Sequence, residues 1–149
     1  MTVTFDSNIL VYAVDSRAGA KHVAAMDVLE RASRSEGVLL LQSMAEFFRT
    51  TTRKLGLSIA DARRALTDWR AVFPVYAADE SSFDRAVTLV ENHGLSFWDA
   101  MMVAAAHDAG CETLLSEDMQ DGREIAKVRI VNPFDPANAA FTRRILGAG

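Results

Sequence analysis

Short apolar runs that alternate with longer amphipathic stretches are the feature that most restricts the fold of this chain. Parallel strands joined through helices require a sheet that is covered on both faces. The residues between the runs repeat apolar side chains at helical spacing, and one such set predicts a buried face formed by Phe83, Ala86, Val87 and Val90. We therefore predict an α/β three-layer sandwich, in which helices flank a mostly parallel sheet of about five strands. The predicted strands are Val3–Phe5, Val38–Leu41, Pro74–Ala77, Thr113–Leu115 and Arg129–Val131.

The length of the chain favours one domain. With 149 residues, of which 50% are hydrophobic and 24% charged, the chain can bury about 70% of its unfolded surface. We predict a single domain over residues 1–149. The only cysteine, Cys111, excludes an internal disulfide and suits a reducing compartment. No apolar run approaches the ~20 residues that span a bilayer and no signal segment precedes the first strand, so we expect a cytoplasmic protein.

Four acidic residues fall where the predicted strands end or the helices begin. Asp6 follows the first strand in "TFDSN", and Asp118 follows the fourth strand in "LLSEDMQDG". Glu46 is expected on the first turn of the helix after the second strand. Asp99 is expected on the first turn of a helix at about 97–109, which starts at the same edge if the chain reverses at "NHGLS". Ligands of open α/β sheets bind outside the carboxyl ends of the strands, so the four carboxylates can converge there.

Each acid also has an ordinary structural explanation. The segments Ser43–Glu46 and Ser96–Asp99 have the spacing of a capping box, and Asp6–Asn8 can form a strand-to-helix turn. The stretch Asp118–Asp121 can be the loop before a short helix around "GREIAK". Four acids among apolar neighbours, however, would repel one another and lose hydration. A divalent cation removes both costs, and oxygen ligands suit Mg²⁺ or Mn²⁺.

These segments together resemble a known family. "TFDSNILVYA", Glu46 after the second strand, "GLSFWDAMMVAAA" and "LLSEDMQDG" resemble the PIN-domain ribonucleases, and in particular the VapC-type toxins of bacterial toxin–antitoxin pairs. The resemblance spans the whole chain and keeps the family's order of acids. It implies a parallel sheet between helices and an acidic pocket in which a metal ion is bound by Asp6, Glu46, Asp99 and Asp118.

The resemblance also implies supporting residues, an activity and partners. Asn8, Ser116 and Asp121 match supporting positions, and Asp121 stays an alternative to Asp118 as the fourth ligand. The implied activity is hydrolysis of RNA phosphodiesters with Mg²⁺ or Mn²⁺ as cofactor. The implied partners are an RNA substrate, a cognate antitoxin that covers the cleft and a second copy of the chain in a homodimer.

A locally basic segment offers a surface for RNA, although the net charge of the chain is −4. The stretch Phe47–Arg70 carries six basic residues and two acidic ones. A solvated helix face explains this composition equally well. Arg49 and Arg53 are one helical turn apart and close to Glu46 in sequence, so we predict that these two arginines contact substrate phosphates.

Other α/β classes fit the chain less well. A receiver-like phosphoacceptor domain needs paired acids after the first strand and a lysine after the fifth, where this chain has "TFDSN" and "RIVNPFD". A haloacid-dehalogenase-like phosphatase needs a second aspartate where this chain has Asn8. A PIN-like binding module without catalysis is a third alternative, and the four intact acids argue against it.

Overall fold

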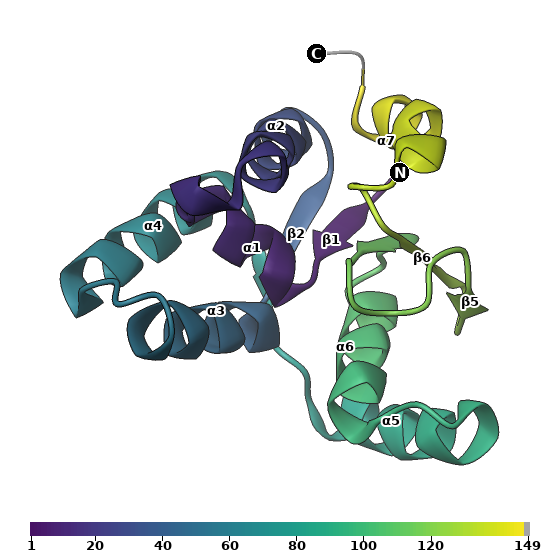
Figure 1. Ribbon diagram of the computed structural model, residues 1–149. Helices are drawn as coiled ribbons and strands as arrows, with labels where there is room; N and C mark the ends of the chain where they lie inside the picture. The colour runs from purple at the N-terminus through teal and green to yellow at the C-terminus, as the bar shows by residue number, and fades with distance from the viewer. Residues whose placement is uncertain (148–149) are drawn as a thin grey trace.

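The sheet confirms the predicted three-layer α/β architecture. The computed structural model describes residues 1–147, so the last two residues of the predicted 1–149 domain lie outside the described part. The strands pair in the order β3-β2-β1-β4-β6-β5, and all pairs are parallel except β5–β6. Figure 1 shows β2, β1, β6 and β5 in this sequence from left to right. The strands span Val3–Phe5 (β1), Gly37–Leu40 (β2), Val75–Tyr76 (β3), Thr113–Leu115 (β4), Glu124–Ile125 (β5) and Val128–Val131 (β6).

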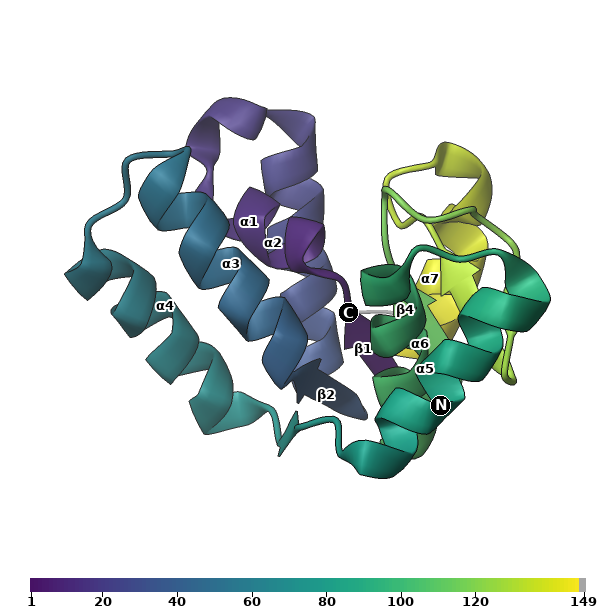
Figure 2. The same ribbon diagram turned by 90° about the horizontal axis from the view of Figure 1, so that it is seen from below.

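Helices cover both faces of this sheet. The core of one face contains residues of α1 to α4 and α7, and the core of the other face contains residues of α5 and α6. Figure 2 shows α1 to α4 on one side of the molecule and α5 and α6 on the other. No helix within residues 1–147 is long and apolar enough to cross a membrane. The helices span Ser7–Val14 (α1), Ala20–Ser33 (α2), Leu41–Arg53 (α3), Ile59–Val72 (α4), Glu80–His93 (α5), Phe97–Asp108 (α6) and Ala139–Leu146 (α7), with short 3₁₀ turns at Ser16–Ala18 and Pro136–Asn138.

The central strands supply side chains to both cores because they are apolar without alternation. Phe5 of β1 packs in the core below α1 to α3, whereas Leu114 of β4 and Ile130 of β6 pack against α5 and α6. All three side chains are fully buried. Strands that are covered on both faces are expected to be apolar throughout, so this part of the prediction is confirmed.

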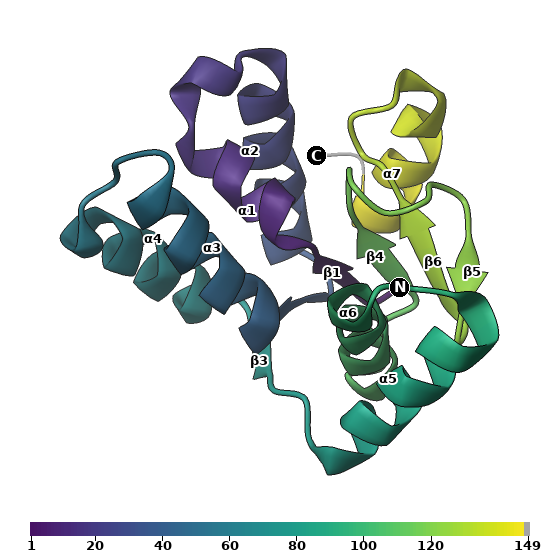
Figure 3. The same cartoon turned by 60° about the horizontal axis from the view of Figure 1, so that its bottom comes forward.

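Helices α5 and α6 form the reversal that brings Asp99 to the site edge. Gly94 between them adopts the left-handed conformation, with φ 67° and ψ 23°, and its N–H donates to the Val90 carbonyl oxygen at 3.0 Å. The start of α6 then lies beside α3, where Gln42 Nε2 donates to the Trp98 carbonyl oxygen at 3.0 Å. Figure 3 shows α6 next to α3 and β1.

The segment "GREIAK" forms a hairpin, so the short helix that we predicted there is wrong. Glu124 pairs with Arg129 and Ile125 with Val128 in the antiparallel β5–β6 ladder. Ala126 and Lys127 have φ values of 51° and 64°, the left-handed pair that a two-residue hairpin turn requires. Six residues are too few for periodicity to separate a helix from a strand, and the neighbouring strand β6 decided the outcome.

The second strand ends one residue earlier than predicted, and this changes the role of Ser43. Since α3 begins directly at Leu41, Glu46 lies in the second turn of the helix rather than the first. The Ser43 hydroxyl is buried and donates to the Phe5 carbonyl oxygen at 2.7 Å. The N-cap of α3 is Leu40, without a side-chain cap. The capping-box explanation for Glu46 is therefore wrong.

Helix α5 is rotated away from the predicted face. Phe83 and Val87 remain 49% and 45% exposed, and the helix buries Ser82, Ala86 and Leu89 instead. Polar contacts explain the difference, because the Ser82 hydroxyl donates to Asp108 of α6 at 2.7 Å. The spacing of apolar residues does not reveal that Ser82 is buried, because its burial depends on a hydrogen bond to Asp108 of another helix.

Candidate functional site

Asp6 lies where β1 passes into α1, at the carboxyl edge of the sheet. Phe5 and Leu115 are partners in the parallel β1–β4 pair, so Asp6 and Ser116 are the next residues on neighbouring strands. The Ser116 hydroxyl donates to Asp6 Oδ2 at 2.7 Å, and the Ser7 N–H donates to Asp6 Oδ1 at 2.7 Å. The second bond makes Asp6 the N-cap of α1. Strand, helix and serine together hold this buried carboxylate in one orientation.

The charges of the four predicted ligands act on one another. Burial raises the pKa of Asp6, the bonds from Ser116 and Ser7 oppose this shift, and the charges of Asp118 and Asp99 add to it. Burial likewise raises the pKa of Glu46, with further contributions from the charges of Asp6 and Asp99. Burial is the main cause of both shifts, and the smaller contributions from Asp6, Asp99 and Asp118 indicate that these acids lie close enough for their charges to interact.

Asp118 and Asp121 face different parts of the molecule. Asp118 Oδ2 accepts a hydrogen bond from Asn8 Nδ2 at 3.2 Å, so it is tied to α1 beside Asp6. Asp121 Oδ1 accepts from the Asn132 N–H at 2.8 Å and from Asn138 Nδ2 at 3.0 Å. Asp121 therefore organises the turn before α7, whereas Asp118 is held next to α1, beside Asp6.

Asp99 lies in the first turn of α6, as predicted, and Ser96 is the N-cap of this helix. The Asp99 N–H donates to Ser96 Oγ at 3.4 Å, and Asp99 lies in the first turn of α6. Its side chain is half-buried. The serine-cap explanation and the ligand explanation are compatible for this acid, because the backbone N–H makes the cap and the carboxylate does not.

One carboxylate oxygen of Glu46 is left without a partner in the described part of the chain. Glu46 Oε1 is buried and has no hydrogen-bond partner within residues 1–147, and a buried unpaired carboxylate oxygen is costly. Carboxylate oxygens are the donor type that a hard cation such as Mg²⁺ or Mn²⁺ prefers. In the described part of the chain, however, no three His, Cys, Asp or Glu side chains are grouped so that they could hold one ion. The structure thus supplies the donor chemistry of a metal site, without an assembled ligand cluster.

Sequence comparison decides the family. Residues 3–128 match the PIN domain family. The chain belongs to this family. No curated protein matches the chain by sequence.

Solved structures share the fold of this PIN domain. A toxin–antitoxin complex from Klebsiella pneumoniae is 24% identical with a TM-score of 0.66, and the match covers 90% of this chain and 99% of that chain. VapC20 of Mycobacterium tuberculosis, a sarcin–ricin loop cleaving toxin, is 18% identical with a TM-score of 0.61 over 78% of this chain and 90% of that chain. VapBC2 from Rickettsia felis, bound to a DNA fragment from its promoter, is 14% identical with a TM-score of 0.65 over 87% and 97%. At these identities the likeness establishes the fold.

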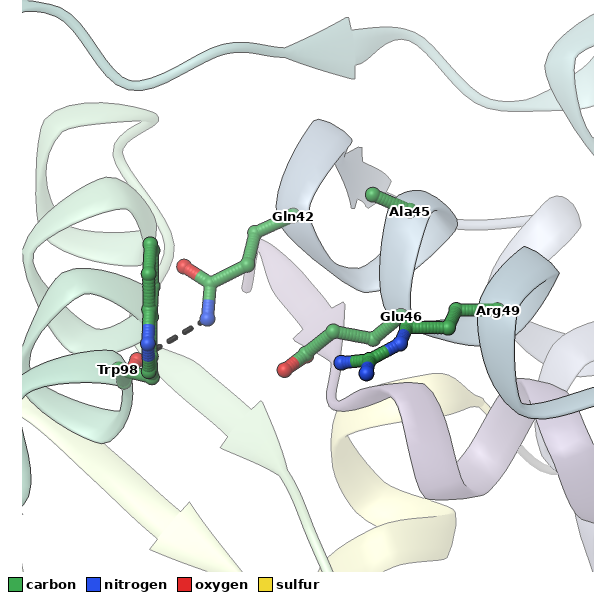
Figure 4. Close-up of a pocket in the computed structure, with 5 residues that line it drawn as sticks. All are labelled: Gln42, Ala45, Glu46, Arg49 and Trp98. Carbon is green, nitrogen blue, oxygen red and sulfur yellow. Dashed lines mark hydrogen bonds between the residues drawn. The ribbon is translucent and has the colours of Figure 1, made fainter.

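Two hollows of the PIN domain lie along α3. Glu46 lines a hollow of about 340 Å³ together with Gln42, Ala45, Arg49 and Trp98 (Figure 4). Arg49 also lines a second hollow of about 280 Å³ with Thr50, Arg53 and Lys54. The predicted proximity of Arg49 to Glu46 is therefore present, and the basic residues continue along the helix from the acidic site.

A polar network that the sequence analysis missed holds the loop after β4. Tyr12 Oη donates to Glu117 Oε1 at 2.6 Å, and Lys21 Nζ lies 2.5 Å from Glu117 Oε2. Burial of the Glu117 carboxylate acts to raise its pKa. The contacts with Lys21 and Tyr12 outweigh burial, so the pKa of Glu117 lies below its usual value. The Glu117 N–H also donates to Asn8 Oδ1 at 3.3 Å. Tyr12 and Glu117 are 105 residues apart, and no sequence pattern links them.

Proposed function

We propose that this PIN domain is a metal-dependent endoribonuclease and the toxin of a toxin–antitoxin pair. The proposal rests on one observation: acids from four separate elements act on one another's charge at the carboxyl edge of a parallel sheet. That edge is where α/β proteins bind ligands. Two of the similar structures are named as a toxin and as a toxin–antitoxin complex, which supports the same activity and an antitoxin partner.

The proposed ligands of Mg²⁺ or Mn²⁺ are Asp6, Glu46, Asp99 and Asp118. When bound, the cation activates water for attack on a phosphodiester and balances the charge of the phosphate. Ser116 and the Ser7 N–H favour the ionised form of Asp6 and orient it, because each donates a hydrogen bond to its carboxylate. Asn8 donates a hydrogen bond to Asp118 Oδ2 and so orients that carboxylate.

The remaining proposals concern substrate and partners. Arg49 and Arg53 are proposed to bind RNA phosphates, since both line the basic hollow next to the site. We propose an antitoxin and a second copy of the chain as protein partners, and Val23 and Met26 of α2, which are 67% and 51% exposed, offer apolar surface for such contacts. We also propose that residues 1–149 form one domain and that the protein acts in the cytoplasm.

Incubation with a mixed pool of RNA tests the activity. The wild-type protein should cut RNA with Mg²⁺ or Mn²⁺ and should not cut it in chelator. Asp99→Asn should abolish cutting without changing the circular dichroism spectrum. Asp61→Asn is a matched control, because Asp61 has the same position after the capping Ser58 of α4, a helix that supplies none of the proposed ligands. Full cutting by Asp99→Asn, or by wild type in chelator, would contradict the proposal.

A further inference from the structure

The side chain of Trp98 is unusually exposed for a tryptophan. Its side chain is 63% exposed, whereas tryptophan is highly buried on average. Its carbonyl oxygen accepts the hydrogen bond from Gln42, and its ring lies 5.0 Å from the Phe97 ring at an interplanar angle of 72°. The residue directly precedes Asp99 of the proposed site. A large aromatic surface is thus held open to solvent at the edge of that site.

One face of the Trp98 ring borders the hollow that contains Glu46. Figure 4 shows the ring edge-on, with Gln42, Glu46 and Arg49 on one side of it. The same ring lines a further hollow of about 280 Å³, whose walls include Tyr76 and Met101. Open space therefore adjoins the ring beside an acid of the proposed metal site.

Basic side chains without carboxylate partners continue from this hollow. Arg49 lines both the Trp98 hollow and the next one, and Arg53 and Lys54 line the second. Among residues 1–147, none of these three cations has a carboxylate oxygen within 4.0 Å. Lys21 and Arg85, by contrast, are each paired with an acid. The three cations along α3 are thus available to an anionic ligand.

We propose that single-stranded RNA crosses α3 and α6 with one base stacked on Trp98 and its phosphates bound by Arg49, Arg53 and Lys54. This inference rests on the proposed ribonuclease function and adds the means of holding the strand. An aromatic platform beside a basic track is how proteins bind single strands. A second protein chain on Trp98 is less suitable, because Glu46 lines the same hollow and glutamate is depleted from the cores of protein interfaces.

Binding of a short single-stranded RNA of about ten nucleotides, measured by fluorescence anisotropy in chelator, tests the stacking platform without cutting. Trp98→Ala should weaken binding about 5- to 150-fold, the equivalent of 1–3 kcal/mol per stacked base. Trp98→Phe should retain most of the affinity, because an aromatic face remains. Phe83→Ala is the matched control and should bind like wild type, since Phe83 is an exposed aromatic that lines neither Trp98 hollow.

The salt dependence of the same binding separates the platform from the phosphate-binding cations. Replacing both Arg53 and Lys54 with alanine should flatten the slope of log affinity against log salt by about 0.7 for each phosphate that the variant no longer neutralises. Trp98→Ala should leave this slope unchanged, because it removes no charge. Replacing the exposed pair Arg63 and Arg64 of α4 with alanine is the control, and the slope of that variant should match wild type.

Two results would overturn this inference. Wild-type affinity in Trp98→Ala would exclude stacking, and a loss of dimer in sedimentation of that variant would assign Trp98 to an interface between copies of the chain. If wild type cuts RNA with Mn²⁺ while Trp98→Ala binds RNA normally, only the stacking platform fails. If wild type neither binds nor cuts RNA, the proposed function itself fails.

Discussion

Replacing Ser116 with alanine would test whether a buried hydroxyl holds Asp6 in its ionised form. Ser116 is 0% exposed, so water cannot take the place of the bond that its hydroxyl donates to Asp6 Oδ2 at 2.7 Å. The same hydroxyl accepts the Met119 N–H at 3.3 Å. A hydrogen bond to a charged group contributes about 1.5–3 kcal/mol. At about 2–4 °C per kcal/mol for a domain of this size, Ser116→Ala should melt roughly 3–12 °C below wild type at pH 7.

Ser43→Ala is the matched control. Ser43 is also 0% exposed, and its hydroxyl donates over the same 2.7 Å to the neutral carbonyl oxygen of Phe5. A neutral hydrogen bond contributes about 0.5–1.5 kcal/mol, which corresponds to a melting loss of roughly 1–6 °C. Because neither partner titrates, this loss should be the same at every pH.

The loss in Ser116→Ala should depend on pH through Asp6. Burial already raises the pKa of Asp6 above its ordinary value of 3.8, and removing the Ser116 donor raises this pKa further. Because the folded-state pKa of Asp6 is raised, the stability that Asp6 contributes is fully present below pH 3.8. This contribution is lost as the pH rises through the folded-state pKa of Asp6. This loss of stability with rising pH is larger in Ser116→Ala than in wild type. The difference from wild type is therefore smallest below pH 3.8 and largest above both folded-state pKa values.

Thermal unfolding followed by circular dichroism in chelator, at pH 7 and below pH 3.8, measures this difference. Acids whose charges do not interact with Asp6 contribute equally in wild type and in both variants, so their contributions cancel in the comparison. An equal loss for Ser116→Ala at both pH values would refute the reasoning. So would a loss at pH 7 that does not exceed that of Ser43→Ala.

Three further predictions concern the acids themselves. Asp6→Asn should melt several degrees above wild type in chelator, because the substitution removes a charge that burial disfavours and keeps an acceptor for the cap of α1. A lower melting temperature than wild type would make Asp6 a purely structural acceptor. Asp118→Asn should weaken Mn²⁺ binding in calorimetry more than Asp121→Asn, which should instead cost about 1 kcal/mol of stability because it weakens the hydrogen bonds that Asp121 accepts from Asn132 and Asn138; the reverse order of Mn²⁺ affinities would reassign the fourth ligand. Induction of wild type in bacteria should arrest growth while Asp99→Asn does not, and equal growth of both strains would contradict the toxin proposal.

The sequence by itself determined the fold class and the strand-end positions of the acids. Runs such as "VLLL" and "TLL" lack polar alternation because each strand is covered on both faces, so burial leaves a direct record in the residue order. Asp6 and Asp118 follow such runs, and their placement at the carboxyl edge needed only the expectation that the strands are parallel. Gly94 marked the reversal between α5 and α6 because a left-handed residue commonly ends a helix.

Only the tertiary structure decided which polar groups meet. Ser43 has the spacing of a helix cap and instead donates to Phe5 of a neighbouring strand, and "GREIAK" became a hairpin because β6 lies beside it. The Tyr12 hydrogen bond to Glu117 joins residues 105 positions apart. Local spacing sets propensity, whereas these outcomes depend on contacts between elements that approach only when the sheet has formed. For the same reason the exposed ring of Trp98 and the hollow beside it have no counterpart in the residue order.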